Sequence, residues 1–165
     1  MAVNVFLEFK EPTIKGECTD SNHKDDVELL AWSHSFSQPT SGTRSSAGGG
    51  TVEMATHGDM SCTKYIDSSS DDLIKMCWSG KHIGKATMHC YRSDGDNKPV
   101  KYLEIEMEDV IISSFGIGGS SGDVPTEQFS MNYGIVTYKY TPTSADGKAS
   151  GVQPIKHDLV KRTVS

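Results

Sequence analysis

The sequence lacks an excess of positive charge and any long apolar segment. Its 165 residues carry 16 Lys and Arg against 22 Asp and Glu, which gives a net charge of −6 with neutral histidines. This balance disfavours a protein that binds nucleic-acid phosphates, because such proteins present a basic surface. No apolar run approaches the roughly 20 residues that span a bilayer. We therefore expect neither nucleic-acid binding nor membrane insertion.

The first residues also lack the features of a secretory leader. No basic residue precedes the first apolar run, and Asn4 and Glu8 interrupt that run. A cleaved signal peptide needs a basic start and a continuous apolar stretch. We therefore expect a protein that stays in the cytoplasm or is exported by a route that needs no such signal.

Cysteine is scarce, and its spacing is not that of a metal site. The chain has four cysteines and six histidines, and no two cysteines form a Cys-x-x-Cys pair. The spacings match no zinc signature. We expect reduced, structural thiols, no metal and no cofactor. The cysteines are Cys18, Cys62, Cys77 and Cys90.

Motifs for catalysis are incomplete. The segment Gly118–Gly122 matches Gly-x-Ser-x-Gly, but that motif needs a helix directly after the serine turn, and here Pro125 and a strand pattern follow. The same segment completes neither a dinucleotide fingerprint nor a phosphate-binding loop. Glu104, Glu106 and Glu108 share one face of a strand, as expected for a solvated polar face. We therefore expect no catalytic residues and no enzyme.

Most of the sequence alternates apolar and polar residues, which is typical of half-buried strands. Glycine, proline and serine clusters separate the alternating runs, and this pattern predicts a mainly β protein. The runs cover residues 3–9, 27–36, 51–56, 61–67, 85–92, 100–115 and 126–140.

The two longest runs reverse their apolar face midway. In the run 100–115, apolar residues lie at odd positions up to Met107 and at even positions from Val110. A period-2 pattern cannot change parity without an extra residue, so we expect a β-bulge or strand break near Glu108–Asp109. The run 126–140 reverses in the same way. Strands of this kind suit a small β-barrel of two curled antiparallel sheets that exchange partners.

One short α-helix is expected to flank this barrel, at about residues 70–79. Ser68–Ser70 supply capping hydroxyls, Asp71 and Asp72 favour the positive end of the helix, and Gly80 ends it. A helix of this length must pack on the barrel to be stable. Its apolar residues are Leu73, Ile74, Met76, Cys77 and Trp78.

Three segments are low in apolar residues and rich in glycine, serine and proline. They are residues 39–50, 116–123 and 142–153. Within a single domain spanning residues 1–165, we expect a projecting loop at 39–50, a second loop at 116–123 and an irregular tail at 142–165. Loops of this length are often functional.

Short sequence words along the chain resemble one known family. They include Lys15–Glu17, Leu30–Ser33, Thr63–Asp67, Ser79–His82, Met107–Ser114, Gly118–Gly122, Pro125–Gln128 and Ala145–Gly147. In this order, from Ala2 to about Gly147, the sequence resembles the hemolysin-coregulated protein (Hcp) family, the tube subunit of the bacterial type VI secretion system.

The resemblance implies a small β-barrel with one helix at its side that assembles into homohexameric rings. The rings stack into a tube, a contractile sheath propels the tube from the cell, and a spike protein sits at its tip. Effector proteins are carried in the lumen. The subunit would assemble in the bacterial cytoplasm and then be secreted by the machine, without a cleaved signal peptide.

The resemblance also suggests site residues. It places the strand that contains Ser33 along the inner wall of the ring. Trp32 is the better core residue, so Ser33 on the opposite face is expected to face the lumen and contact effectors. The loop at 39–50 is expected to touch the next ring. Its proposed stacking residues are Pro39, Ser41, Thr43, Arg44, Ser45, Gly48 and Gly49.

Three features depart from the family pattern. His34 stands where relatives often have another aromatic residue, the tail 155–159 lacks an expected tryptophan-containing ending, and Gly134 interrupts a long strand. The residues by themselves also allow another class of protein. In that alternative, the chain is a monomeric ligand-binding β-barrel whose pocket is lined by Trp32, Met88 and Met107.

Overall fold

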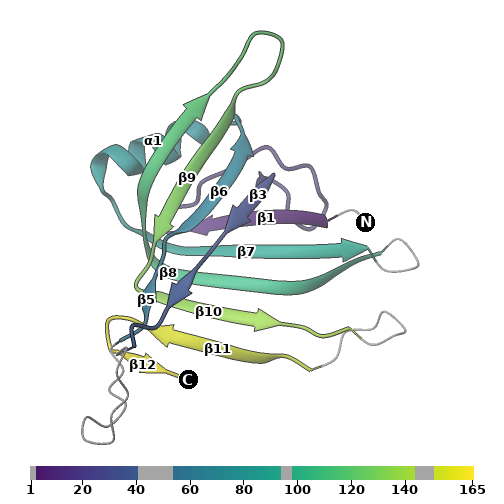
Figure 1. The fold of residues 1–165 in the computed structure, drawn as a ribbon. Helices are drawn as coiled ribbons and strands as arrows, with labels where there is room; N and C mark the ends of the chain where they lie inside the picture. The colour runs from purple at the N-terminus through teal and green to yellow at the C-terminus, as the bar shows by residue number, and fades with distance from the viewer. Residues whose placement is uncertain (1–2, 41–53, 94–97, 144–150) are drawn as a thin grey trace, which may run out of the picture.

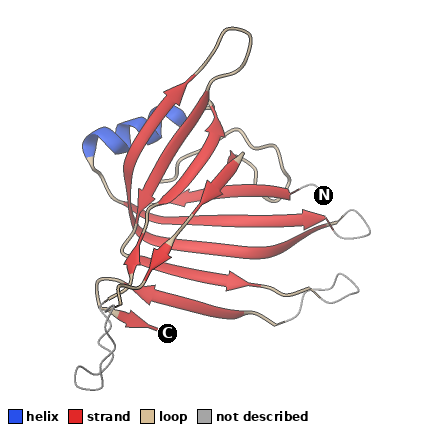
Figure 2. Ribbon diagram, in the orientation of Figure 1, coloured by secondary structure: helices blue, strands red, loops and turns tan. Residues whose placement is uncertain are grey.

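The computed structural model describes residues 3–40, 54–93, 98–143 and 151–165, and these are mainly β-strands with one α-helix (Figure 2). The mainly β fold with one helix is therefore confirmed. The strands are β1 (Val3–Lys10), β2 (Val27–Leu29), β3 (Ala31–Ser33), β4 (Phe36–Ser37), β5 (Thr56–His57), β6 (Met60–Tyr65), β7 (Ile83–Ser93), β8 (Pro99–Gly118), β9 (Thr126–Asn132), β10 (Ile135–Tyr140), β11 (Gln153–Asp158) and β12 (Thr163–Val164), and the helix is α1 (Ser70–Ser79).

The strands form curled antiparallel sheets that share β8. One series runs β12-β11-β10-β8-β7-β1-β2, and a branch continues from β8 through β9 and β6 to β3. In Figure 1 the branch rises steeply across the strands of the first series. Among the described residues the ladders do not close into a barrel, because β2 pairs with β1 whereas β3 pairs with β6. The two-stranded ribbon of β4 and β5 is a separate sheet.

The expected break in the run 100–115 is confirmed at Asp109, where φ is 56°. Before it, β8 pairs with β10, beginning at Glu108 opposite Ile135. After it, β8 pairs with β9, from Ile111 opposite Asn132. The left-handed residue re-phases the strand, so apolar side chains at odd positions before it and at even positions after it all reach the core.

Two predicted strands are divided in the structure. The run 126–140 forms β9 and β10, because the chain turns at Tyr133–Gly134 and the Gly134 N–H donates to the Glu108 carbonyl at 3.0 Å. The run 27–36 forms β2, β3 and β4. Its chain crosses from β1 to β6 at Leu30, whose N–H donates to the Thr63 carbonyl at 2.8 Å. In both places one predicted run contributes strands to two different sheets. Periodicity alone does not reveal this division.

Two segments expected to be irregular contain strands. β8 continues to Gly118, so the loop predicted at 116–123 begins later and joins the projecting β8–β9 hairpin of Figure 1. The tail predicted to be irregular from 142 to 165 forms β11 and β12, with β11 paired along β10. Residues 51–53 of the predicted run 51–56 lie outside the described residues, and β5 begins at Thr56.

Helix α1 occupies its predicted range and packs against β8. Gly80 ends it in the left-handed conformation, with φ 64° and its N–H donating to the Met76 carbonyl at 3.0 Å. The predicted serine cap is wrong, because Ser69 makes no side-chain capping bond and instead donates its own N–H to the Asp67 carboxylate. Trp78 is 85% exposed, so it is not part of the core.

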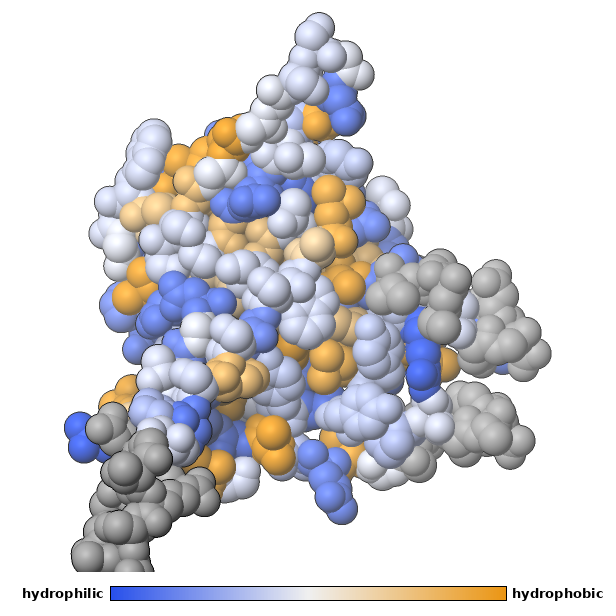
Figure 3. Space-filling view, in the orientation of Figure 1, coloured by the Kyte–Doolittle hydropathy of each residue, from blue (hydrophilic) through white to orange (hydrophobic). Residues whose placement is uncertain are grey.

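The core lies between the two sets of strands and under α1, and its largest fully buried side chains include Phe9, Phe129, Met88 and Met107. Apolar residues also reach the surface between polar ones on the face shown in Figure 3. The exposed large apolar residues include Phe36, Ile117, Val124, Ile155, Val160 and Val164.

Candidate functional site: a serine-lined sheet face

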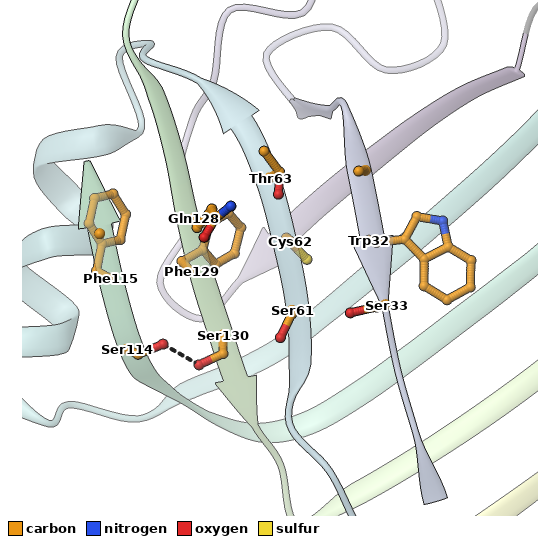
Figure 4. A pocket seen from close by; sticks show the side chains of 12 residues that line it. Trp32, Ser33, Ser61, Cys62, Thr63, Ser114, Phe115, Gln128, Phe129 and Ser130 are labelled. Carbon is orange, nitrogen blue, oxygen red and sulfur yellow. Dashed lines mark hydrogen bonds between the residues drawn. The ribbon is translucent and has the colours of Figure 1, made fainter. Parts of the chain in front are cut away.

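A row of four serines crosses the outward face of the sheet formed by β3, β6, β9 and the second half of β8. Ser33 pairs with Ser61, Ser61 with Ser130, and Ser130 with Ser114. Figure 4 shows these side chains on the same side of neighbouring strands. The row arises because one serine from each strand has the same parity and the same register position.

The next row on this face is also small and uncharged. Ala31, Thr63, Gln128 and Gly116 occupy successive register positions. Residues of the opposite parity turn toward the core side. Cys62 and Phe129 are buried there, and Trp32 and Phe115 are partly buried. Together the two outward rows line a shallow hollow of about 550 Å³.

Hydrogen bonds fix one side of the serine row and leave the other side unpaired. The Ser130 hydroxyl bonds with those of Ser113, at 2.8 Å, and Ser114. Ser113 donates to the Asp59 carboxylate at 2.6 Å, and the Asn132 amide donates to the same carboxylate at 2.9 Å. Within the described residues, the Ser33 and Ser61 hydroxyls have no protein partner, so they are available to solvent or to a bound molecule.

Ser33 is exposed and Trp32 packs against the core, as the contrast between the two residues predicts. That this face of Ser33 lies toward a lumen stays a prediction, and so does the contact of Ser33 with effectors. Of the expected stacking residues, Pro39 lies within the described part of the chain and is half-buried. The others lie in the range 41–53, outside the described residues. Those outside are Ser41, Thr43, Arg44, Ser45, Gly48 and Gly49.

Sequence reasoning missed Ser61, Ser114 and Ser130. Period-2 alternation assigns each of them to a face of its own strand. It does not reveal which strands are neighbours, and that pairing is what places these serines in one row with Ser33.

The pocket of the ligand-binding alternative is not formed by its proposed residues. Met88 and Met107 are fully buried in the packed core, whereas Trp32 is only partly buried against that core. The three side chains therefore do not line a common cavity.

The glutamates on β8 form a surface ion-pair ladder. Lys85 Nζ lies 2.5 Å from Glu106 Oε1, and Lys139 Nζ lies 3.1 Å from Glu106 Oε2. The hydrogen bond from Lys85 holds the pKa of Glu106 below its ordinary value. A general acid needs a raised pKa, so this carboxylate fits the polar face that its sequence pattern predicts.

Two features of other protein classes concern the described parts of the chain: clustered metal ligands and membrane-spanning helices. No group of three or more His, Cys, Asp and Glu side chains there is arranged to hold a metal ion. No helix in those parts combines the length and apolar character needed to cross a membrane.

Comparison with known proteins decides the family. The family described as "Type VI secretion system effector, Hcp" matches residues 6–140. The chain belongs to the Hcp family. Its sequence is 39% identical over 158 residues to Protein hcp1 of Pseudomonas aeruginosa, covering 95% of this chain and 94% of that protein.

Solved Hcp structures share the fold. A crystal structure of Hcp1 from Salmonella typhimurium is 25% identical, has a TM-score of 0.78 and is matched over 100% of both chains. A second structure, of a type six secretion system protein, has a TM-score of 0.90 at 23% identity, covering 99% of this chain and 100% of that one. This Hcp chain is thus a type VI secretion protein with a β-rich fold, and the whole serine row lies within the family match.

Proposed function

We propose that this Hcp protein is a structural subunit of the type VI inner tube. It assembles into hexameric rings that stack, and its serine-lined face forms the wall of the lumen and contacts effector proteins. In this proposal the rings assemble in the cytoplasm, with the contractile sheath and tip spike as further partners, and leave the cell with the machine.

The observation that carries the lumen assignment is the row Ser33–Ser61–Ser130–Ser114. A conduit must let different proteins enter and leave. Its wall should therefore carry small, polar side chains and no strong charges. Serine and threonine hydroxyls can donate and accept hydrogen bonds, and each such bond contributes only about 1 kcal/mol net. An uncharged row of this kind supports weak, reversible retention of cargo.

The native mass in solution tests the ring. Closed rings form through head-to-tail interfaces whose rotation closes, and a hexamer has about six times the 17.9 kDa mass of one chain. Light scattering at micromolar concentration should give this mass, and negative-stain images should show rings. A monomer would overturn the ring and favour the alternative of a monomeric ligand-binding barrel.

Ser33→Gln tests the lumen wall. The larger side chain would project at equivalent positions around the ring, so we expect rings that assemble and are exported but retain less of a small effector in co-purification. Ser37→Gln, at an exposed position on β4 outside the serine row, is the matched control. Equal retention by both variants would contradict the assignment of this face.

Deletion of Ser41–Ala47 tests the stacking proposal for the segment 39–50. This segment is glycine-rich and Arg44 is its single charged residue. We expect the deletion to leave rings intact and to abolish tubes in negative-stain images. A chain that no longer folds would mean that the segment stabilises the barrel instead.

A further inference from the structure

Three histidines and two tyrosines meet where four distant segments of the chain come together. Their hydrogen bonds form one continuous series. The members are His34 between β3 and β4, His57 in β5, Tyr133 between β9 and β10, Tyr138 in β10 and His157 in β11. We call this group the histidine–tyrosine network.

Each contact in the network is a hydrogen bond that needs one donor and one acceptor. The Tyr133 hydroxyl lies 2.6 Å from His34 Nε2 and 2.7 Å from His57 Nδ1. His34 Nδ1 bonds with the Tyr138 hydroxyl, and His57 Nε2 lies 2.7 Å from His157 Nδ1. If each histidine is neutral and carries one proton, every one of these contacts has one donor and one acceptor. The series is then fully satisfied.

The contact between His57 and His157 holds only one proton. If both imidazoles were protonated, two N–H groups and two like charges would face each other across 2.7 Å. Protonation of both rings therefore destroys this contact, whereas it forms when one of the two facing nitrogens is unprotonated.

The surroundings oppose protonation. Burial, and then the charge of His57, lowers the pKa of His34 to about 4. Burial, and then the charge of His157, lowers the pKa of His57. Tyr133 and Tyr138 stay uncharged at neutral pH because burial raises the pKa of both.

Among the described residues, few other charged groups face the network. The Asp59 carboxylate acts on His34 in the opposite direction, toward a higher pKa, and it is already bonded to Ser113 and Asn132. Lys156 of β11 lines the apolar hollow next to the His57–His157 contact. The aromatic ring of Phe36 covers both His34 and His57, with centroid distances of 4.4 Å and 4.9 Å.

The network joins the β4–β5 ribbon to the body of the protein. Among the described strands, β4 and β5 form ladders only with each other. His57 of the ribbon reaches β11 through His157 and the β9–β10 turn through Tyr133. Phe36 of the ribbon lies beside Tyr138, with ring centroids 5.8 Å apart, over an apolar hollow of about 350 Å³.

We propose that the histidine–tyrosine network is a pH-sensitive latch that holds the β4–β5 ribbon against β10 and β11 at neutral pH and releases it on acidification. Above the ordinary histidine pKa of about 6.5, His34 and His57 are neutral in both the latched and released states. Below that value the released state binds protons first, so the latch weakens about tenfold per pH unit for each proton taken up.

Hydrogen–deuterium exchange of the full-length protein, analysed by peptide mass spectrometry, tests the latch. Exchange is measured at about pH 7.5 and about pH 5 and corrected for the intrinsic pH dependence of amide exchange. We expect peptides covering 54–59 and 153–158 to lose protection about tenfold or more at the lower pH. The core peptide 83–92 should stay protected. Unchanged protection of the ribbon, or simultaneous loss in the core peptide, would overturn the latch.

His157→Asn is the matching variant, because an amide can hydrogen-bond to His57 but does not take up a proton. We expect one of two results for this variant. Its ribbon stays protected to a lower pH than in the parent, or it exchanges rapidly already at about pH 7.5. Either result shows that the His57–His157 contact holds the ribbon in place. His82→Asn is the control, since His82 is exposed and neither it nor its partner Asp109 belongs to the network. Parent-like release in both variants would overturn the proposal. The native mass of each sample is measured separately, so a failure of ring assembly remains distinguishable from a failure of the latch.

Discussion

Lys64 and Glu127 form an ion pair whose side chains have no exposed surface, beneath the N-terminus of α1. Lys64 Nζ lies 2.6 Å from Glu127 Oε2 and 2.9 Å from Asp67 Oδ1. Ser70, in the first turn of the helix, donates to Glu127 Oε2 at 2.9 Å. The pair thus ties α1 to β6 and β9. A buried charge is tolerated only when it is paired, so removing one partner should cost far more than removing both.

We expect Lys64→Met to lower the free energy of unfolding by about 3–5 kcal/mol, because Glu127 is left charged and buried. The double variant Lys64→Met/Glu127→Leu should recover most of this loss. Urea unfolding of the three proteins measures the effect. Lys10→Met is the control, since the Lys10–Glu8 pair is exposed and should contribute no more than about 1 kcal/mol. An equal cost for Lys64→Met and Lys10→Met would contradict the prediction.

His89 is a buried imidazole without a hydrogen-bond partner for either ring nitrogen among the described residues. Burial, and then the charge of Lys101, lowers its pKa, although Glu8 lies 3.5 Å away. A histidine whose pKa is lowered by folding is neutral in both states above about pH 6.5. Below that value the unfolded state takes up the proton first, so stability falls as the pH falls.

Replacing His89 with Leu should remove this contribution. We expect the variant to become more stable relative to the parent as the pH is lowered from about 7 to about 5, by up to about 1.4 kcal/mol per pH unit. Thermal or urea unfolding across this range gives the difference. His82→Leu, at an exposed position, is the matched control for the loss of a histidine. A constant difference between parent and His89→Leu would rule out titration of His89 as the cause.

At the scale of elements, β8 is the strand that connects the two sheets. It pairs with β10 before Asp109 and with β9 after it, and β7 runs beside it as a further partner. The change of partner requires φ 56° at Asp109. Aspartate adopts the left-handed region at less cost than most residues, and β-branched residues adopt it at the highest cost.

The stability of variants at Asp109 should follow how well the new residue tolerates a positive φ. We expect Asp109→Val to be less stable than Asp109→Gly by about 1–2 kcal/mol. Asp109→Ala controls for loss of the exposed contact with His82, which contributes little. Urea unfolding gives the ranking, and a Val variant as stable as the Gly variant would show that this backbone conformation is not required.

At the scale of the whole molecule, the β8–β9 hairpin extends beyond the body (Figure 1). Phe115 on β8 still packs against the core and stacks with Phe129, with ring centroids 6.2 Å apart. Ile117, two residues further on the same side, is 53% exposed, and Val124 across the loop is 54% exposed. Exposed apolar residues on a projecting hairpin are compatible with a surface that another protein covers, and we propose that a neighbouring subunit of the ring covers this one.

Ile117→Glu should therefore weaken assembly without unfolding the subunit. We expect a lower native mass by light scattering, because a charge would be buried at a subunit contact, while circular dichroism retains the β signal. Ser120→Glu, at an exposed polar position in the same hairpin, should keep the parent mass. Full-sized rings from Ile117→Glu would show that the hairpin lies outside the subunit contacts.

The sequence alone determined the features that depend on local chemistry. Alternation of apolar and polar residues predicted most of the strands, and acidic residues followed by Gly80 predicted the helix within its observed range. The parity change predicted the break at Asp109, and the contrast between Trp32 and Ser33 predicted which side chain faces outward. These inferences succeed because side-chain direction and turn conformation are set within a few residues.

The tertiary structure alone decided which segments became neighbours. It placed Ser33 in one row with Ser61 and Ser130, divided the runs 27–36 and 126–140 between sheets, and turned the tail into β11 and β12. It also buried Lys64, a residue that any composition rule assigns to the surface. Pairing and register join residues far apart in the chain, and the histidine–tyrosine network joins positions as distant as 34 and 157. Such contacts are selected by packing of the whole core and not by local propensity.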